Sequence, residues 1–477
     1  MTQQYDFGMI GLGVMGSNLL LNMADHHFAA IGFDLKPERG QALEAAASKG
    51  TIVKGVNSLE AMVKALKQPR KIMMLVPAGK PVDDVIESLL PILEKGDILI
   101  DGGNSFYQDT LQRIQYLQPK GIHFMGMGIS GGEMGARTGP SMMPGGDKEA
   151  YEYLKPILES IAANAEGVPC VAFMGNGAAG HYVKMVHNGI EYAMMQMISE
   201  IYDILHKGAG LDYNILQEVF ITWNSSRLQS FLVEITADIF RTADTESEDP
   251  KQLLIEKILD VGAAKGTGKW TSQEGMNLGV AIPSIDAAVA MRHISSWKEL
   301  RQTAAEIYIS REKTIEIEQQ EIISMAEQAL YSGFMLAYAQ GLALLTEASV
   351  ALGMNINIPD VISVWRSGCI IRSAMLETFA KAYHQSPSLT HLLLDKEIAG
   401  LLQQHTPALR RIVGLGIESK IPVLALANAV GYLDACCSER LPMNLVQAQR
   451  DYFGAHTYRR TDREGAFHTE WHTGSGW

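Results

Sequence analysis

FGMIGLGVMGSNLLLNM occupies residues 7–23 and decides the fold of the N-terminal part of the chain. A short apolar strand leads directly into the pattern G-x-G-x-x-G at 11–16, and an apolar helical pattern follows it. The first glycine permits a tight turn, the second lets the backbone approach a pyrophosphate, and the third allows close helix–strand packing. In this strand–turn–helix context the pattern predicts a dinucleotide site at a helix N-terminus. A tight turn without a ligand is the alternative.

Alternating strand and helix patterns continue through residues 1–178. Alternation of this kind predicts a parallel, doubly wound sheet of the Rossmann type with helices on both faces. The expected strands are 7–10, 29–33, 71–76, 97–101, 123–127 and 168–174.

Asp34 follows the second expected strand, about 20 residues beyond the first glycine of the motif. A carboxylate there accepts hydrogen bonds from both ribose hydroxyls and repels a 2′-phosphate. Leu35 comes next, where an NADP site usually has an arginine, whereas Lys36 could still reach a 2′-phosphate. The residues therefore favour NAD, with NADP as the alternative.

Long helical patterns replace the strands from residue 179 and predict an all-helical domain over 179–437. The expected helices are 179–208, 212–223, 226–240, 250–261, 284–307, 315–352 and 357–381. Segments 210–232 and 353–376 share a Gly, an acid-bearing helix, a Trp and an Arg, which indicates an internal duplication. Chance similarity between amphipathic helices is the alternative. The tail, 438–477, has no sustained period, but its aromatic residues favour packing against another surface.

Four polar residues fall at i, i+3, i+4 and i+7 within the helical stretch 181–202. They are Lys184, His187, Asn188 and Glu191. This spacing puts them on one face of a helix that is otherwise rich in Met and Ile. An amine, an imidazole, an amide and a carboxylate on one line predict a proton-transfer surface. A solvated helix face is the alternative, although such a face would usually carry more charge.

Two glycine-rich segments predict loops that approach a small polar ligand. DGGNS (101–105) follows an expected strand, which places Asn104 at the carboxyl edge of the sheet, where ligands bind. The second segment is ISGGEMGARTGPSMMPGG (129–146). Its first turn comprises Ser130, Gly131 and Gly132. An ordinary turn-rich loop is the alternative for this second segment.

A third glycine-rich segment, AAKGTGKW (263–270), carries anion-binding donors. It presents Lys265 and Thr267, which are groups that a phosphate or carboxylate needs. Arg292 lies in an Ala- and Val-rich helical pattern, and taken alone it is expected to form a structural ion pair.

The composition excludes several classes of function. A net charge of −13 argues against nucleic acid or an anionic membrane as a main partner. The four cysteines have no C-x-x-C spacing, so neither a zinc site nor a disulfide framework is expected. No signal peptide is evident, and no uninterrupted apolar run approaches the roughly 18 residues of a membrane span. These features together predict a cytoplasmic protein.

Five segments resemble the 6-phosphogluconate dehydrogenase (decarboxylating) family. They are DGGNS, SGGEMGARTGPSMMPGG, KMVHNGIEY, AAKGTGKWT and RDYFGAHTY, in that family's order and spread over essentially the whole chain. The resemblance implies a Rossmann domain, a duplicated helical domain and a tail that inserts into the partner subunit of a homodimer. Pairing of two such dimers stays open.

The resemblance also implies an activity, which is oxidative decarboxylation of 6-phospho-D-gluconate to D-ribulose 5-phosphate and CO₂. NAD or NADP would be reduced and no metal would be required. Lys184 is implied as the general base and Glu191 as the general acid. The implied substrate-binding residues are Asn104, Ser130, Gly131, Gly132, His187, Asn188, Tyr192, Lys265, Thr267 and Arg292, with Arg450 and His456 from the other subunit. The implied cofactor-binding residues are Gly11, Leu12, Gly13, Val14, Met15, Gly16, Asp34, Leu35, Lys36, Val76, Pro77, Ala78 and Asn104.

The chain departs from the family pattern at the cofactor site. Members that use NADP usually have Asn-Arg-Ser/Thr where this chain has Asp34, Leu35 and Lys36, and Lys where it has Pro77. Both departures favour NAD.

Two other functions stay open. A dehydrogenase for a small unphosphorylated β-hydroxy acid would not need Lys265, Arg292 and Arg450, and it would usually be shorter than 477 residues. A catalytically silent nucleotide-binding scaffold would not need Lys184 and Glu191.

Overall fold

The computed structural model describes residues 3–249, 251–264, 266–308 and 314–471. It divides into two compact units, Met1–Ala429 and Val430–Trp477, which are described separately. The division falls inside helix α18 (Leu424–Cys436), before the expected start of the tail at 438.

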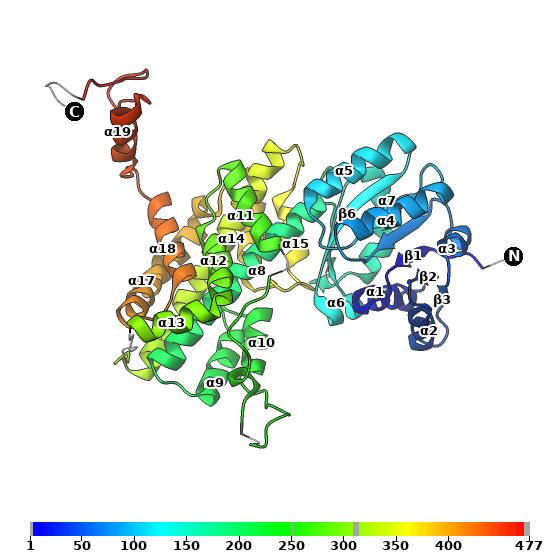
Figure 1. Cartoon of the computed structure of the whole chain (residues 1–477), viewed down its shortest axis with the longest axis horizontal. Coiled ribbons are helices and arrows are strands. Elements are labelled where there is room, and N and C mark those ends of the chain that lie inside the picture. The colour runs from blue at the N-terminus through cyan, green and yellow to red at the C-terminus, as the bar shows by residue number, and fades with distance from the viewer. Residues whose placement is uncertain (1–2, 250, 265, 309–313, 472–477) are drawn as a thin grey trace. The chain divides into compact units, whose positions relative to one another are not determined.

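The first unit begins with a seven-stranded sheet in the order β3-β2-β1-β4-β5-β6-β7, drawn in blue to cyan in Figure 1. Strands β1 to β6 are parallel, and β7 runs antiparallel to β6 at one edge. The strands are β1 (Phe7–Ile10), β2 (Ala30–Phe33), β3 (Val53–Val56), β4 (Lys71–Met74), β5 (Ile98–Asp101), β6 (His123–Ser130) and β7 (Ser141–Gly145). The connecting helices are α1 (Val14–Asp25), α2 (Pro37–Ala46), α3 (Leu59–Ala65), α4 (Lys80–Leu89), α5 (Tyr107–Leu117), α6 (Gly132–Thr138) and α7 (Lys148–Ile161). This arrangement confirms the Rossmann-type fold.

Apolar side chains cover both faces of the sheet because helices pack on both sides. Met9 joins one core cluster with Leu19 and Leu20 of α1. Its neighbour Ile10 joins the opposite cluster, which contains Ile86 of α4. Strand β1 is therefore buried along its whole length, which is why it appears as a continuous apolar run in the sequence.

The strands differ from the sequence expectations in three places. Segment 129–146 contains the end of β6, helix α6 and strand β7, which excludes the alternative of an ordinary turn-rich loop. Strand β3 was missed because it has only four residues, too few for an alternation of apolar and polar side chains to be recognised. Of the expected strand 168–174, only Val168–Pro169 forms a strand, β9, which pairs with β8 (Asn164–Ala165).

Helices make up the rest of the first unit, drawn from green to orange in Figure 1. They are α8 (Ala179–Asp203), α9 (Tyr213–Asn224), α10 (Phe231–Ile239), α11 (Thr267–Leu278), α12 (Pro283–Ser296), α13 (Lys298–Tyr308), α14 (Gln319–Ala351), α15 (Ile358–Trp365), α16 (Met375–Gln385), α17 (Lys396–Glu418) and α18. Helix α8 packs against β6, β7, α11, α12 and α14, so it joins the sheet to the helices. Helix α14 is long and apolar enough to cross a membrane by length and composition, but 67% of its most apolar window is buried in the fold.

The two segments expected to be duplicated fold alike. Segment 210–232 forms α9 and the start of α10, and segment 353–376 forms α15 and the start of α16. The connections inside the two segments lie against each other, because Ser230 and Ser373 form an antiparallel bridge. Two backbone hydrogen bonds flank it, from Phe231 N to Arg372 O and from Ala374 N to Gln229 O.

Some helix boundaries differ from the sequence expectations. Residues 284–307 form two helices that meet at Trp297, and 357–381 is interrupted between α15 and α16. In the described part of 250–261 only a 3₁₀ turn forms, at Leu254–Glu256. Amphipathic periodicity continues across each break, which is why the sequence alone did not place these boundaries.

Glycines allow α8 to approach β6 and β7 at backbone distance. A Cβ at Gly180 would lie 2.2 Å from Gly126 O, and a Cβ at Gly145 would lie 2.2 Å from Gly180 N. A Cβ at Gly128 would lie 2.3 Å from the Cβ of Lys184. The first turns of α8 are therefore fixed against the sheet, and Lys184 is fixed with them.

Replacement of Gly128 by Ala tests this close packing. Because the new methyl group would overlap with Lys184, we expect Gly128→Ala to lower the free energy of unfolding by about 2 kcal/mol, measured by urea denaturation. Gly400→Ala in α17 is the matched control: nothing lies within 4 Å of the added Cβ, and better helix propensity should raise stability by up to about 1 kcal/mol. Equal stability of the two variants would contradict the packing argument.

Candidate active site

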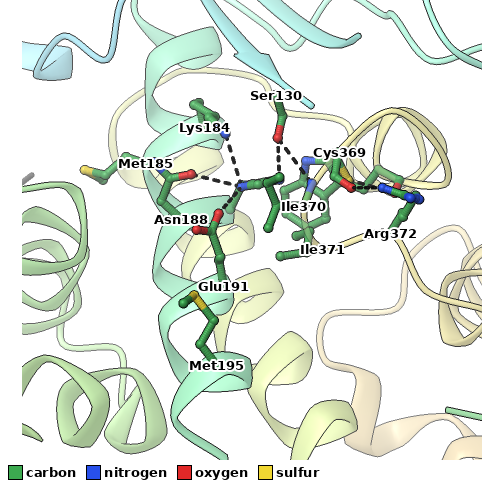
Figure 2. Close-up of polar contacts among 12 residues, drawn as sticks. Ser130, Lys184, Met185, Asn188, Glu191, Met195, Cys369, Ile370, Ile371 and Arg372 are labelled. Carbon is green, nitrogen blue, oxygen red and sulfur yellow. Dashed lines mark hydrogen bonds and ion pairs between the residues drawn. The ribbon is translucent and has the colours of Figure 1, made fainter. Parts of the chain in front are cut away.

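Lys184, His187, Asn188 and Glu191 lie along one side of α8, as the sequence predicted. Figure 2 shows Lys184, Asn188 and Glu191 on the helix, with Ser130 and the Cys369–Arg372 loop opposite them. His187 is completely buried at the centre of the group. Its Nδ1 lies 3.4 Å from Lys184 Nζ, 3.1 Å from Asn188 Oδ1 and 3.9 Å from Glu191 Oε2. The imidazole therefore lies within hydrogen-bond distance of the amine and the amide, and the carboxylate is farther away.

Burial shifts the ionisation of these groups toward their neutral forms. Burial lowers the pKa of Lys184 below 10.5, although the Glu191 carboxylate opposes this shift. Burial likewise lowers the pKa of His187 well below 6.5, and the positive charge of Lys184 adds to the effect. The pKa of Glu191 is raised by burial and opposed by Lys184 and Arg292. An amine that loses its proton easily thus faces a carboxyl group that keeps its proton more readily.

Ser130 contacts the polar residues of α8 from the side of the sheet. It is the last residue of β6 and is buried, and its Oγ lies 3.3 Å from His187 Nε2. Ile370 N donates a hydrogen bond of 3.4 Å to the same Oγ. Gly131 and Gly132 follow at the start of α6, both with positive φ. The Cys369–Arg372 loop is a part of this site that the sequence analysis missed, because only the fold brings it to the end of β6.

A pocket of about 480 Å³ lies at the carboxyl ends of β1, β4 and β5. Eight of the expected cofactor-binding residues line it: Gly13, Val14, Met15, Gly16, Val76, Pro77, Ala78 and Asn104. Four lining residues were not expected: Leu75, Gly102, Gly103 and Ile129. A Cβ at Gly11 would lie 2.4 Å from Leu75 O, and one at Gly16 would lie 1.9 Å from Gly11 O. A Cβ at Gly13 would meet nothing within 4 Å. Two glycines are therefore needed by the turn, whereas Gly13 leaves open space of the kind that a pyrophosphate requires.

Asp34 lies at the end of β2, as expected, but protein donors already occupy most of its carboxylate. Oδ2 accepts from Leu12 N at 2.8 Å and from Arg39 Nη1 at 3.0 Å, and Oδ1 accepts from Lys36 N at 3.0 Å. Burial opposes ionisation, but these donors hold the pKa of Asp34 below 3.8. A carboxylate has about four lone-pair sites. The protein donors thus leave about one lone-pair site of this carboxylate unused.

Arg39 is a residue that the sequence analysis missed beside the expected ribose site. Its side chain is 43% exposed and pairs with Asp34. It lies in the first turn of α2, where no pattern marks it in the sequence. Leu35 is 90% exposed, and Lys36 is exposed as well. The rim of this site therefore carries both an ionised acid and two basic side chains.

The loop that carries Asn104 is held by a buried network. Asp101 accepts hydrogen bonds from Gly103 N, Ser105 Oγ and Arg113 Nη1 at 3.0, 2.6 and 3.3 Å. Arg113 also donates to Gly79 O at 3.0 Å, so it links the two loops that line the pocket. Asn104 itself is exposed at this edge of the sheet.

Tyr192, Thr267 and Arg292 come together at the far end of the polar stripe. The Arg292 guanidinium lies 3.4 Å above the Tyr192 ring, and Arg292 donates to Ala263 O at 2.6 Å. Thr267 begins α11, whose Gly268 is so close to Tyr192 that a Cβ would lie 2.5 Å from its ring. Arg292 forms no ion pair within the described residues, which contradicts the expectation for that residue taken alone. Lys265, expected in the same cluster, lies outside the described residues.

Arg450 and His456 belong to the second unit. Arg450 lies in α19 (Met443–Gly454), His456 follows that helix, and both are exposed. Among the residues that the structure describes, no group of three or more His, Cys, Asp or Glu side chains is placed to hold a metal ion.

Comparison with known proteins identifies the family. The model of the NAD binding domain of 6-phosphogluconate dehydrogenase matches residues 6–175, and that of the C-terminal domain of the same enzyme matches residues 180–471. The chain belongs to the 6-phosphogluconate dehydrogenase family. The resemblance noted in the sequence is therefore confirmed.

Three relatives illustrate how similar this chain is to the family. It is 47% identical to "6-phosphogluconate dehydrogenase, NADP(+)-dependent, decarboxylating" of Bacillus subtilis, covering 97% of this chain and 98% of the relative. It is 46% identical to the decarboxylating 6-phosphogluconate dehydrogenase of Synechococcus elongatus, covering 98% and 99%. The solved structure of Plasmodium falciparum 6-phosphogluconate dehydrogenase superposes with a TM-score of 0.94 at 42% identity, covering 98% of this chain and all of that one.

The buried amine leads to a prediction about stability. Burial disfavours the ammonium form of Lys184, so an apolar side chain of similar size should be more stable at this position. We therefore expect Lys184→Met to raise the free energy of unfolding by about 1–2 kcal/mol. Between the lowered folded-state pKa and 10.5 the unfolded chain binds more protons, so wild-type stability rises with pH there. The advantage of the variant should therefore be largest at lower pH and shrink toward pH 10.5.

Urea denaturation at several pH values measures this effect. Lys207→Met is the control, because Lys207 is 47% exposed in an ion pair with Asp203 and should change stability by less than about 0.5 kcal/mol. A loss of stability in Lys184→Met at neutral pH would show that the amine is better solvated or paired than its burial implies.

Proposed function

We propose that this chain catalyses the oxidation and decarboxylation of 6-phospho-D-gluconate to D-ribulose 5-phosphate and CO₂. The observation that carries the proposal is the buried Lys184–His187–Glu191 group on α8, which faces Ser130 at the end of β6. Relatives that match nearly the whole chain are decarboxylating 6-phosphogluconate dehydrogenases by name. A cytoplasmic location accompanies the proposal, since phosphorylated sugar acids and nicotinamide dinucleotides are metabolites of that compartment.

Lys184 and Glu191 carry the two proton transfers in this proposal. A bound nicotinamide dinucleotide supplies the acceptor for the hydride from C3 of the substrate. Lys184 Nζ takes the proton of the C3 hydroxyl, a role that burial favours because it lowers the pKa of the amine. The resulting ammonium then donates a hydrogen bond to the C3 oxygen, which gains negative charge as CO₂ leaves. Glu191, whose pKa is raised by burial, donates its proton to the carbon that has lost CO₂, which becomes C1 of ribulose 5-phosphate.

The remaining polar residues bind the substrate. Ser130, Gly131, Gly132, Asn104, His187 and Asn188 surround the position of the reacting carbons. Tyr192, Thr267 and Arg292 would bind the phosphate end, where the N-terminus of α11 offers free amides. Lys265 is assigned to the same end from the sequence alone. The Arg292 guanidinium stacks on Tyr192 and forms no ion pair with a carboxylate in the described part of the chain, so its charge is available to a phosphate.

A homodimer that exchanges tails would complete the phosphate site with Arg450 and His456 from a second copy. Large apolar side chains are exposed around α19: Leu445 at 61%, Val446 at 41% and Phe453 at 73%. Exposed apolar area of this kind favours burial against another protein surface.

NAD is the proposed cofactor, in preference to NADP. The support is the ionised carboxylate of Asp34, which lies where a 2′-phosphate would be bound and would repel it. The relative from Bacillus subtilis is named as NADP-dependent. Arg39 and Lys36 provide positive charge beside Asp34, so NADP should be used as well, but less efficiently.

The Lys184→Met variant also tests the activity. We expect kcat with 6-phosphogluconate to fall by about 10³-fold or more, because the variant lacks the amine that accepts the C3 hydroxyl proton. The dissociation constant of the dinucleotide, measured by fluorescence titration, should stay within about twofold, and Lys207→Met should have normal turnover. Substantial activity in Lys184→Met would exclude Lys184 as the base.

Initial rates with NAD and NADP as separate variable substrates test the cofactor proposal. We expect kcat/KM for NAD to exceed that for NADP by about tenfold or more, since a single unfavourable charge contact is worth about 1.4 kcal/mol or more. Asp34→Asn should narrow this ratio, mainly through a lower KM for NADP. A wild-type preference for NADP would show that Arg39 and Lys36 outweigh Asp34.

A further inference from the structure

The tail in the second unit is organised by one buried carboxylate. Asp451 of α19 has no exposed surface, although most residues around it are exposed. Its Oδ1 accepts from Thr457 N at 3.0 Å and lies 2.9 Å from His468 Nδ1. Its Oδ2 accepts from Thr469 N at 3.1 Å and from Trp471 Nε1 at 2.8 Å. Four donors use all of the roughly four lone-pair sites of a carboxylate, so this group is fully committed to the tail.

The backbone around His456 is held in an unusual conformation. Ala455 and Thr457, on either side of it, have φ of 47° and 60°. Left-handed conformations are unfavourable for residues with a Cβ, and most so for a β-branched residue such as Thr457. They persist only where the surrounding structure imposes them.

Two side chains of α19 impose this conformation by holding the Thr457 peptide groups from both sides. Asp451 accepts from Thr457 N, and Gln447 Nε2 donates to Thr457 O at 2.6 Å. Gln447 Oε1 accepts in turn from Arg450 Nη1 at 3.3 Å. One amide side chain thus connects Arg450 to the strained segment that presents His456.

The two basic side chains are left available for an anion. Both Arg450 and His456 are exposed, and within residues 430–471 no carboxylate forms an ion pair with either. The His456 ring packs on Gly454, where a Cβ would lie 2.7 Å from two ring atoms. Contacts within the tail therefore hold Arg450 and His456 in place and leave their side chains without a carboxylate partner there.

We propose that Asp451 and Gln447 are positioning residues that place Arg450 and His456 for an oxyanion bound at the site of a second copy of the chain. This inference rests on the proposed function, in which the tail contributes those two residues to the phosphate site. The tail would then reach the other subunit with its shape already formed, which reduces the ordering that binding requires.

Steady-state kinetics of Asp451→Asn test the inference. The amide has the size of the carboxylate, but its NH₂ group must face two N–H donors, so the arrangement around Thr457 is disturbed. We expect KM for 6-phosphogluconate to rise about tenfold or more, with kcat and the KM of the dinucleotide within about threefold. The control is Asp462→Asn, because Asp462 is exposed and pairs only with Arg460 among the described residues, and it should leave every constant unchanged.

The double variant Arg450→Ala/His456→Ala separates this inference from the proposed function. If that variant leaves KM unchanged, the tail does not contribute to the site and the proposed function is wrong on this point. If it raises KM, adding Asp451→Asn to it should give little further change, because the residues that Asp451 positions are gone. An equal further rise, or a normal KM in Asp451→Asn alone, would overturn the inference.

A second variant covers the case in which Asp451→Asn fails to fold or assemble. Gln447→Leu removes only the amide, and light scattering should give the same particle mass as for the wild type. We expect its KM for 6-phosphogluconate to rise about threefold or more with kcat preserved. An unchanged KM in a correctly assembled Gln447→Leu enzyme would also overturn the inference.

Discussion

Backbone-to-backbone packing of α8 on β6 and β7 is the constraint on which the rest of the first unit depends. Gly126, Gly128, Gly145 and Gly180 lack the Cβ atoms that would separate helix from sheet. Because the contact is so close, Lys184 lies beside the end of β6, within reach of the groups around Ser130. The same helix packs against α11, α12 and α14, so one rigid element connects the dinucleotide-binding sheet to the helices that carry the other ligand-binding groups.

Burial then gives the stripe of α8 its chemistry. An amine in this environment has a lowered pKa and a carboxyl group a raised one, and both shifts have desolvation as their largest cause. Both shifts favour the neutral form of the group in the folded protein, which an exposed lysine or glutamate would not experience.

The second unit is held together differently from the first. It is short, and polar contacts to Asp451 organise it. Burial opposes ionisation of Asp451, but His468, Trp471 and Thr469 hold its pKa at about 2. The carboxylate is therefore charged throughout the physiological range, and its hydrogen bonds keep the tail folded around α19. Apolar side chains of α19 stay exposed, which suits a segment that packs on another surface.

The sequence by itself determined the Rossmann domain, the helical domain and the polar stripe of α8, because each depends on local periodicity or on a motif of fixed spacing. It did not reveal β7 inside a glycine-rich segment, the pairing of Arg39 with Asp34, or the role of Asp451. Those features were decided by tertiary structure: a strand rich in Gly and Pro is stable only beside β6, and a buried carboxylate is defined by donors far along the chain. Contacts between distant segments leave no periodic signal, so only the folded chain shows them.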